Sequence, residues 1–248
     1  MSKISSSHML ESRIMFQQSE LNILSAGAPK TGVRLCAEFY STATGNPFEI
    51  EFATAPAICE RIRAGTASAD VIVLPVRTIE EFEKDGTMVA ESTIELGSVS
   101  AGVAVRNSTW EPDLSSVEAF RQALLAADVL IYNRASSGRH LETVIDGLGL
   151  TRNVNEKTVR TDTGAGAMKH LAGDRSGRAI GFGQITEIKL QESLGIHLVG
   201  SLPKELNLKT SYCAGLSCSA ENSVDAKTLL AYFASREGRR ILLASGLE

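Results

Sequence analysis

Two junctions between a strand and a helix near the N-terminus have the composition of an anion-binding site. Residues 23–30 and 49–56 each run from a strand pattern through small residues to a proline. Small residues let the backbone approach a ligand closely, and proline suits the first turn of a helix, where its missing N–H costs nothing. The free N–H groups at a helix start, together with the helix dipole, attract anions. These two segments therefore predict half of a ligand site.

A third junction, at residues 133–138, follows an aliphatic strand pattern and sets arginines beside serines. Arg134 and Arg139 could grip a planar carboxylate with paired hydrogen bonds, whereas backbone and hydroxyl groups suffice for a tetrahedral oxyanion. A hydrogen bond to a charged group contributes about 1.5–3 kcal/mol, so one arginine would shift the preference toward organic acids. The alternative is that both side chains face solvent; Arg134, which precedes the expected helix start, is the stronger candidate.

Lys30 and His140 are the residues near these junctions whose side chains could carry a proton. Lys30 directly follows the proline of the first junction, and His140 lies in the helix expected after the third. A lysine moves protons in catalysis only when it is desolvated. The alternative is a lysine that faces water and a surface histidine, which is the commoner situation for a histidine on a helix.

The sequence lacks the motifs that are typical of NTP hydrolysis, zinc proteolysis and serine hydrolase chemistry. The chain has no GxxxxGK[ST] loop, no HExxH pair and no GxSxG elbow. Residues 164–167 are similar to part of a dinucleotide loop, but the third glycine is missing, so we interpret them as a helix start that touches the ligand. Four cysteines without a CxxC pair or a histidine cluster are typical of small buried residues. We therefore expect no cofactor and no bound metal.

The composition narrows the class of protein. With 43% hydrophobic residues, the 248-residue chain can bury a large core in one or two domains. Its net charge of −4 and the lack of a basic stripe disfavour nucleic acid as a partner. Residues 1–20 lack the apolar centre of a secretory leader, and residues 5–9 could be an expression-vector remnant. We expect a periplasmic protein if a native leader was removed, and a cytoplasmic one if this N-terminus is native.

Strand and helix patterns alternate from residue 21 to residue 86. Residues 70–75 are almost wholly aliphatic, which predicts a strand that is buried on both faces. Such alternation is typical of a parallel sheet with helices on both faces. Two extended passages, at residues 94–106 and 202–217, interrupt the alternation of strands and helices and are expected to cross between domains.

Five short segments, by their order and spacing, resemble the molybdate-binding proteins of ABC importers. They are residues 24–28, 52–55, 61–65, 69–73 and 181–183. The resemblance runs from residue 21 to the C-terminus and implies a type 2 periplasmic-binding-protein fold, an α/β chain with two Rossmann-like lobes joined by two crossover strands. It implies that residues 21–97 and 210–248 form one lobe, that residues 98–209 form the other, and that the ligand is clamped between them. Residues 1–20 would then be an extension or a tag.

The sequence departs from this family at the ligand positions. Hydroxyl groups at the first two junctions donate to the oxyanion in molybdate binders, but the aligned positions here hold Gly27 and either Ala55 or Pro56. Ser25 and Thr54 lie close by and could substitute. The tyrosine expected after residues 181–183 is Gln184. Since Gly27 removes a donor and leaves a roomier site, we expect a ligand larger than molybdate.

We therefore expect a monomeric solute-binding protein that closes on a small organic carboxylate and delivers it to an ABC permease. The ligand-binding residues expected from the junctions are Ser25, Ala26, Gly27, Thr54, Ala55, Pro75, Arg134, Ser136, Ser137, Gly138 and Gln184. The alternative is an enzyme on the same scaffold. Aconitate isomerase resembles the molybdate-binding family, so a closed cleft of this kind could isomerise an unsaturated polycarboxylic acid without a cofactor. Lys30 or His140 would then carry the proton.

Overall fold

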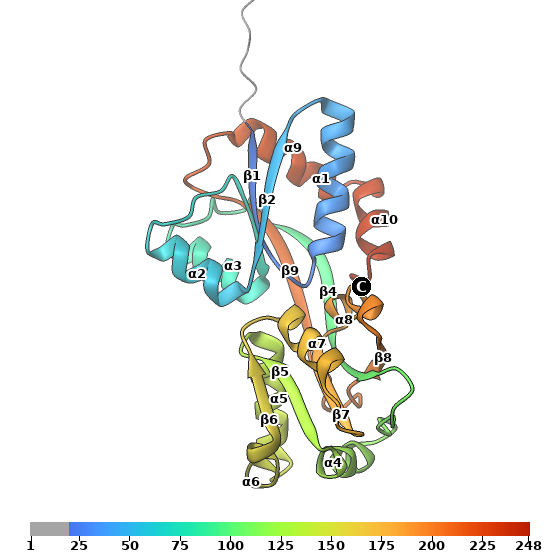
Figure 1. The fold of residues 1–248 in the computed structure, drawn as a ribbon. Helices are drawn as coiled ribbons and strands as arrows, with labels where there is room; N and C mark the ends of the chain where they lie inside the picture. Colours follow the sequence, from blue (N-terminus) through green and yellow to red (C-terminus); the bar gives the residue numbers. More distant parts are fainter. Residues whose placement is uncertain (1–19) are drawn as a thin grey trace, which may run out of the picture.

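The chain folds into two halves that share one long strand, β4 (Ile94–Arg106) (Figure 1). The structure, a computed structural model, describes residues 20–248, so the predicted N-terminal extension lies outside it except for Glu20. Lobe 1 contains β1 (Leu21–Ala26), α1 (Lys30–Thr44), β2 (Phe48–Ala53), α2 (Ala55–Arg63), β3 (Val71–Pro75), α3 (Val76–Lys84), β9 (Lys209–Leu216), α9 (Ser223–Ala234) and α10 (Arg236–Ala244). Lobe 2 contains α4 (Val117–Ala126), β5 (Val129–Asn133), α5 (Ser136–Gly147), α6 (Thr151–Val154), η1 (Asn155–Lys157), β6 (Thr158–Thr161), α7 (Gly164–Gly173), β7 (Ala179–Gln184), α8 (Ile185–Lys189), η2 (Glu192–Leu194) and β8 (Ile196–Ser201).

The described strands form one nine-stranded sheet in the order β2-β1-β3-β9-β4-β7-β5-β6, with β8 also paired to β4. In lobe 1, β1 lies between the parallel strands β2 and β3, and in lobe 2, β5 lies between the parallel strands β6 and β7. The aliphatic strand β3 is buried from Val71 to Leu74, as predicted. Helices α1 and α10 lie on one side of the lobe 1 sheet and α2 and α3 on the other (Figure 1), which is the arrangement that alternating strands and helices favour.

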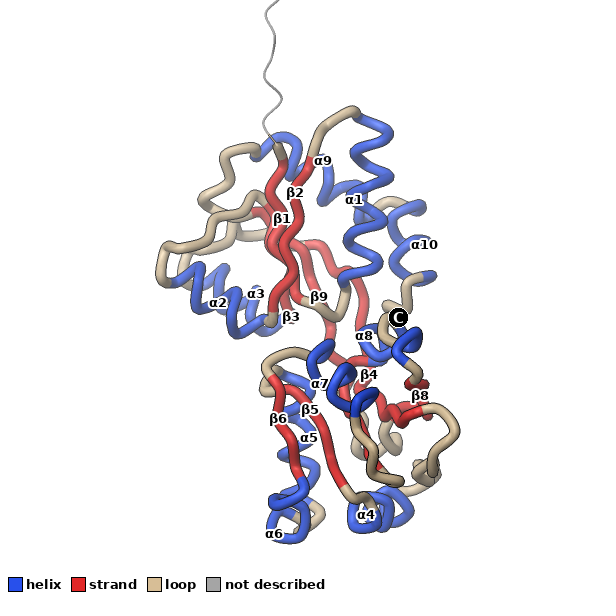
Figure 2. Tube along the Cα trace, in the orientation of Figure 1, coloured by secondary structure: helices blue, strands red, loops and turns tan. Residues whose placement is uncertain are grey.

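Two antiparallel strands, β4 and β9, cross between the lobes (Figure 2). They pair from Ile94 opposite Ala214 to Ser100 opposite Lys209. Beyond this stretch β4 continues into lobe 2, where it pairs with β7 and β8. β4 spans the whole of the first extended passage predicted from the sequence, whereas β9 is shorter than the second because residues 202–208 form a turn ahead of it.

Each lobe has its own hydrophobic core. The core of lobe 1 takes buried side chains from residues 21–99 and 212–247, with Phe82 and Phe233 among the largest. Two clusters in lobe 2 take theirs from residues 101–202, including Phe120. Among the helices of residues 20–248, none has both the length and the apolarity to span a bilayer.

Gly138, in the first turn of α5, lets this helix start directly against the end of β5. A Cβ atom at position 138 would overlap the carbonyl oxygen of Asn133. We expect Gly138→Ala to lower the free energy of unfolding by about 3 kcal/mol, because the helix and the strand must move apart. Urea denaturation of the purified protein measures this change.

Gly147→Ala is the matched control, since Gly147 ends the same helix and a Cβ there would meet no atom within 4 Å. Alanine is a better helix former than glycine, so this variant should be as stable as the wild type or up to about 1 kcal/mol more stable. Equal stability of the two variants would contradict the packing role of Gly138.

Candidate functional site

A cavity of about 220 Å³ lies between the two lobes, at the carboxyl ends of the parallel strands. Lobe 1 lines it with Ala26, Gly27, Ala28, Lys30, Phe52, Ala53, Thr54, Ala55 and Tyr212. Lobe 2 lines it with Asn133, Ala135, Ser137, Thr163, Gly164, Ala165, Gln184, Glu187, Leu190 and Gln191. Since α/β sheets bind ligands at this edge, the cavity is the candidate ligand site.

Helices α1, α2, α5 and α7 begin at the cavity wall. The N-cap residues of α1, α2 and α5 are Pro29, Thr54 and Ala135, and none of them makes a side-chain cap hydrogen bond. The N-cap of α7, Thr163, accepts a hydrogen bond from the backbone N–H of Gly166. Helix starts with uncapped N–H groups attract negative charge. The cavity is therefore suited to an anion.

Among the described residues that line the cavity, Lys30 is the one with a cationic side chain. Its Nζ lies 5.1 Å from the centre of the Phe52 ring, and the guanidinium of Arg34, one turn later in α1, lies at the same distance of 5.1 Å. A cation over an aromatic face is attracted to it. Phe52 thus holds Lys30 beside the cavity, whereas Arg34 is not among the lining residues.

Glu187 brings a carboxyl group into this anion site. It is the third residue of α8, and its carboxyl accepts a hydrogen bond from the backbone N–H of Gln184, the N-cap of that helix. Its Oε1 would lie 2.7 Å from a Cβ atom at Gly27, and its Oε2 would overlap a Cβ atom at Gly164. The two glycines, one from each lobe, therefore leave the space that this carboxyl group fills.

Burial raises the pKa of Glu187 from 4.5 to about 7, and the hydrogen bond from Gln184 offsets part of that rise. The residue as a whole is partly exposed, and its carboxyl oxygens lie beside Gly27 and Gly164. Burial, and then the charge of Glu187, raise the pKa of Tyr212 above its usual range, so this phenol stays protonated. The cavity therefore holds a carboxyl that exchanges its proton near neutral pH, beside a permanent hydrogen-bond donor.

A hydrogen bond between the lobes lies directly beside the cavity. The hydroxyl of Thr186 in α8 donates to the carbonyl oxygen of Ala28 at 2.7 Å, and both residues are buried. This bond joins the start of α8 to the first junction of lobe 1. Because Glu187 is the next residue, its backbone position is set by contacts with both lobes.

Gln184 attaches the same helix start to the two crossover strands. Its amide is assigned from the hydrogen-bond network, with the nitrogen donating to the carbonyl oxygens of Val99 and Ser100 at 3.2 Å each. Its oxygen accepts from the hydroxyl of Thr210 at 3.3 Å. Gln184 lines the cavity, but its side-chain amide is engaged by β4 and β9.

Comparison with known proteins assigns the family. A model of the bacterial extracellular solute-binding protein family matches residues 21–248. The chain belongs to this family. A curated relative, the aconitate isomerase of a Pseudomonas species, is 27% identical over 234 residues, which are 92% of this chain and 87% of the relative.

Solved structures confirm the predicted fold of this solute-binding protein. The periplasmic molybdate-binding protein of Azotobacter vinelandii has a TM-score of 0.72 at 16% identity, over 92% of this chain and 99% of that one. The tungstate ABC transporter structure from Geobacter sulfurreducens has a TM-score of 0.69 at 12% identity, over 91% of this chain and 98% of that one. At these identities the likeness shows the fold alone, which is the α/β fold of periplasmic binding proteins.

The structure brings part of the predicted ligand set of this solute-binding protein to the cavity. The lining residues that were predicted are Ala26, Gly27, Thr54, Ala55, Ser137 and Gln184, together with Lys30 as a proton carrier. Gly27 does not open additional space for a ligand, because the carboxyl of Glu187 lies where its side chain would be. The expectation of a larger ligand therefore loses the support that this glycine was thought to provide.

Other predicted residues lie outside the cavity lining. Ser25 is buried, and its hydroxyl donates to the carbonyl oxygen of Ala26 at 3.0 Å. Pro75 ends β3, and Ser136 begins α5. Gly138 packs against the end of β5. Ser25, Pro75 and Gly138 shape the strand ends and the start of α5 around the cavity and are not among its lining residues. The side chain of Ser136 lies outside the part of the chain that the structure describes.

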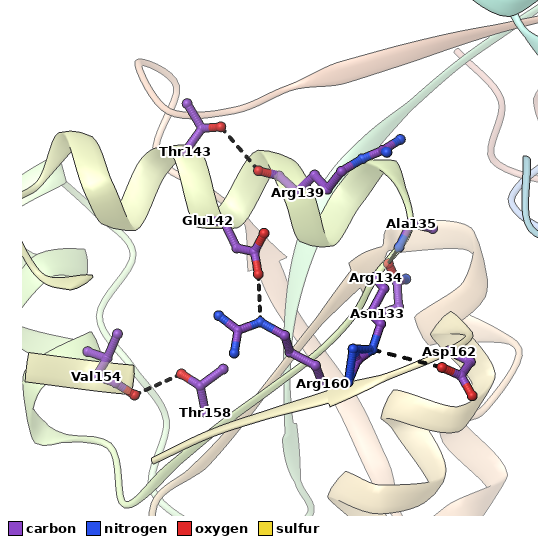
Figure 3. Close-up of polar contacts among 10 residues, drawn as sticks. All are labelled: Asn133, Arg134, Ala135, Arg139, Glu142, Thr143, Val154, Thr158, Arg160 and Asp162. Atoms are coloured by element: carbon purple, nitrogen blue, oxygen red, sulfur yellow. Dashed lines mark hydrogen bonds and ion pairs between the residues drawn. The ribbon is translucent and has the colours of Figure 1, made fainter. Parts of the chain in front are cut away.

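The arginines of the third junction are also not among the lining residues. The side chain of Arg134 is 61% exposed, and its Nε lies 3.9 Å from Oδ1 of Asp162 (Figure 3). Arg139 is exposed, and Nε2 of His140 lies 2.8 Å from the carbonyl oxygen of Leu206. The junction meets the cavity through neutral groups instead.

Sequence reasoning missed Asn133 and Glu187. Asn133 ends β5 and is buried; its Oδ1 accepts from the N–H of Ala135 at 2.9 Å, and its Nδ2 donates to Oγ of Ser137 at 3.2 Å. In the sequence, Asn133 could have been recognised as a polar residue at the end of an aliphatic strand pattern. The signal of Glu187 is its spacing of three residues from Gln184, the spacing at which a glutamate reaches back to a helix start. In residues 20–248, no group of three His, Cys, Asp or Glu residues could hold a metal ion.

The raised pKa of Glu187 makes the ligand-free protein less stable as pH rises. Between pH 4.5 and about 7, the folded chain keeps a proton that the unfolded chain has lost, and above this range an ionised carboxyl is buried. A shift of this size costs on the order of 3 kcal/mol. We expect the stability of Glu187→Gln relative to wild type to increase by about 2–3 kcal/mol from pH 5 to pH 8, measured by urea denaturation.

Glu192→Gln is the control, because Glu192 is an exposed carboxylate in the turn that follows α8. This variant keeps Glu187, so it should lose stability between pH 5 and pH 8 as the wild type does. A difference between Glu187→Gln and wild type that is independent of pH would contradict the raised pKa.

Proposed function

We propose that this protein closes its two lobes on a small organic acid, held through its carboxylates, and presents it to an ABC importer. The observation that carries the proposal is the interlobe cavity onto which Lys30 and the uncapped starts of α1, α2 and α5 converge. These groups supply N–H donors and a positive charge to an anion. Membership of the solute-binding family supports this function.

The cavity walls favour an organic acid over a tetrahedral oxyanion. Phe52, Leu190 and several alanines offer apolar contact, which a carbon skeleton can use and a bare oxyanion cannot. Asn133 and Ser137 supply neutral polar groups for carboxylate oxygens. When ionised, Glu187 repels a nearby negative charge, so a ligand with an uncharged section fits beside it better than a compact dianion.

The family also indicates where the protein works. The family is that of bacterial extracellular solute-binding proteins, and similar structures include a periplasmic protein and an ABC transporter component. We infer that the protein works outside the cytoplasm and that an ABC permease is its partner.

A thermal-shift panel tests the ligand class. The panel contains molybdate, tungstate, sulfate, citrate, cis-aconitate and trans-aconitate. A ligand at about 100 times its Kd stabilises the fold by roughly 2.7 kcal/mol. We expect an organic acid to raise Tm in this way and the inorganic anions to leave it unchanged. A response to an inorganic anion alone would overturn the carboxylate assignment.

Matched variants in the same titration show whether Lys30 contacts the bound acid. A hydrogen bond to a charged group contributes about 1.5–3 kcal/mol, so Lys30→Met should raise Kd at least about tenfold. Arg34→Met is the control, because Arg34 stacks on the same Phe52 ring at the same distance without lining the cavity. If the two variants lose the same affinity for the acid, the loss comes from the change in net charge and not from a contact between Lys30 and the acid.

A second candidate function is isomerisation of the bound acid. The relative named aconitate isomerase is similar over 92% of this chain. The cavity also holds the carboxyl of Glu187, whose pKa of about 7 suits general acid–base catalysis at neutral pH. Such an enzyme would move a proton between two carbon atoms of an unsaturated polycarboxylic acid, and the double bond would move with it.

Incubation with trans-aconitate tests this candidate. We expect cis-aconitate to form, followed by chromatography, and the product to take up deuterium when the reaction runs in deuterated water. Protein denatured by heat is the control and should give neither. If the native protein binds the acid without turnover or deuterium uptake, the enzyme function is refuted and the binding function stands.

A further inference from the structure

We propose that Glu187 is the catalytic residue of this isomerase, which removes a proton from one carbon atom of the bound acid and returns it to another. The inference rests on the second candidate function above and names the group that performs its chemistry.

The carboxyl of Glu187 is held in place from both lobes. Its neighbour Thr186 is hydrogen-bonded to Ala28 across the lobes at 2.7 Å. Its two oxygens lie against Gly27 of lobe 1 and Gly164 of lobe 2. A general base must be fixed within hydrogen-bond reach of the proton that it takes. Glu187 lies in the cavity wall, between the lobes that would enclose the ligand, which places its carboxyl beside the space for the acid.

The groups that face Glu187 suit a base whose proton leaves and returns. Within residues 20–248, the other titratable residues that line the cavity are Lys30 on α1 and Tyr212 on β9. Lys30 can hold a carboxylate of the acid, and the protonated phenol of Tyr212 can donate a hydrogen bond. Burial keeps the pKa of Glu187 near 7, so both of its protonation states are populated at neutral pH.

The reaction balances without a redox partner. Ionised Glu187 takes a proton from the methylene carbon next to the C=C bond; that C–H bond breaks, and its electron pair spreads over three carbon atoms and the adjoining carboxylate. The protonated carboxyl exchanges its proton with water and then gives a proton to the far carbon of this unit, where a C–H bond forms and the C=C bond shifts by one position. Lys30 and the helix N–H groups stabilise the negative charge that develops on the carboxylate.

The two residues predicted from the sequence as proton carriers fit this step less well. His140 does not line the cavity, and its Nε2 lies 2.8 Å from the carbonyl oxygen of Leu206. Lys30 is exposed and lies over Phe52, and a lysine becomes a base at neutral pH only when it is desolvated. Lys30 is better suited to hold the substrate.

Kinetics of Glu187→Gln test the proposal, because glutamine keeps the shape of the side chain but cannot take up the proton. We expect kcat for conversion of trans-aconitate to cis-aconitate to fall about 10²–10⁴-fold, with KM little changed and the thermal shift by the acid retained. In the wild type, kcat/KM should rise with pH through about 7 as Glu187 ionises. The residual kcat/KM of Glu187→Gln should not show this rise with pH. Glu192→Gln should keep the wild-type rate and the wild-type pH profile of kcat/KM.

Gly27→Ala is a second variant that leaves the chemistry of Glu187 intact. The new Cβ atom would lie 2.7 Å from Oε1 of Glu187 and would displace the carboxyl. We expect kcat to fall at least about tenfold, since catalysis depends on alignment. If Glu187→Gln does not fold, this variant decides, and an unchanged rate overturns the proposal.

The outcomes separate this inference from the function on which it rests. If the wild type isomerises the acid and folded Glu187→Gln keeps a comparable rate with the same pH profile, the role of Glu187 is overturned while the isomerase stands. If the wild type binds the acid and does not isomerise it, both the isomerase and this inference fail, and the solute-binding function remains.

Discussion

The pairing of β4 with β9 is the constraint on which the arrangement of the site depends. β9 pairs with β3 in lobe 1 and β4 continues from β9 to the strands of lobe 2, so the carboxyl ends of the two sets of parallel strands face each other across one cavity. At that edge each strand leads into a helix, and the helix starts therefore converge from two sides. Gln184 bonds to the carbonyl oxygens of β4 and to Thr210 of β9, which attaches the start of α8 to the strands that connect the lobes.

Within this geometry the cavity combines groups that attract an anion with one that repels it. Lys30 and the starts of α1, α2 and α5 favour negative charge, whereas ionised Glu187 opposes it. Because burial raises the pKa of Glu187 to about 7, this residue can become neutral by taking up a proton when an anion approaches. A scaffold of this kind can therefore serve binding or proton transfer, and the side chains in the site decide between them.

The fold was predictable from the sequence to a large extent. The aliphatic run of β3 indicated a strand buried on both faces, and β4 occupies the full extended passage at residues 94–106. The site was predictable at its helix starts, since small residues before a helix form an anion cradle wherever the helix packs. The sequence favoured Arg134 as a ligand contact because this residue adjoins the third junction. In the structure its side chain lies beside Asp162. Distance along the chain does not set the direction of a side chain.

By itself, the sequence determined which strands are buried, where helices begin and which family the chain resembles, because hydrophobic periodicity and local backbone preferences encode these features. Only the tertiary structure decided which side chains meet in the cavity. Glu187 lies far along the chain from Gly27, and its carboxyl is enclosed because Gly27 and Gly164 come together from different lobes. Its raised pKa is a consequence of that enclosure, and desolvation exists only once the lobes have folded around the group.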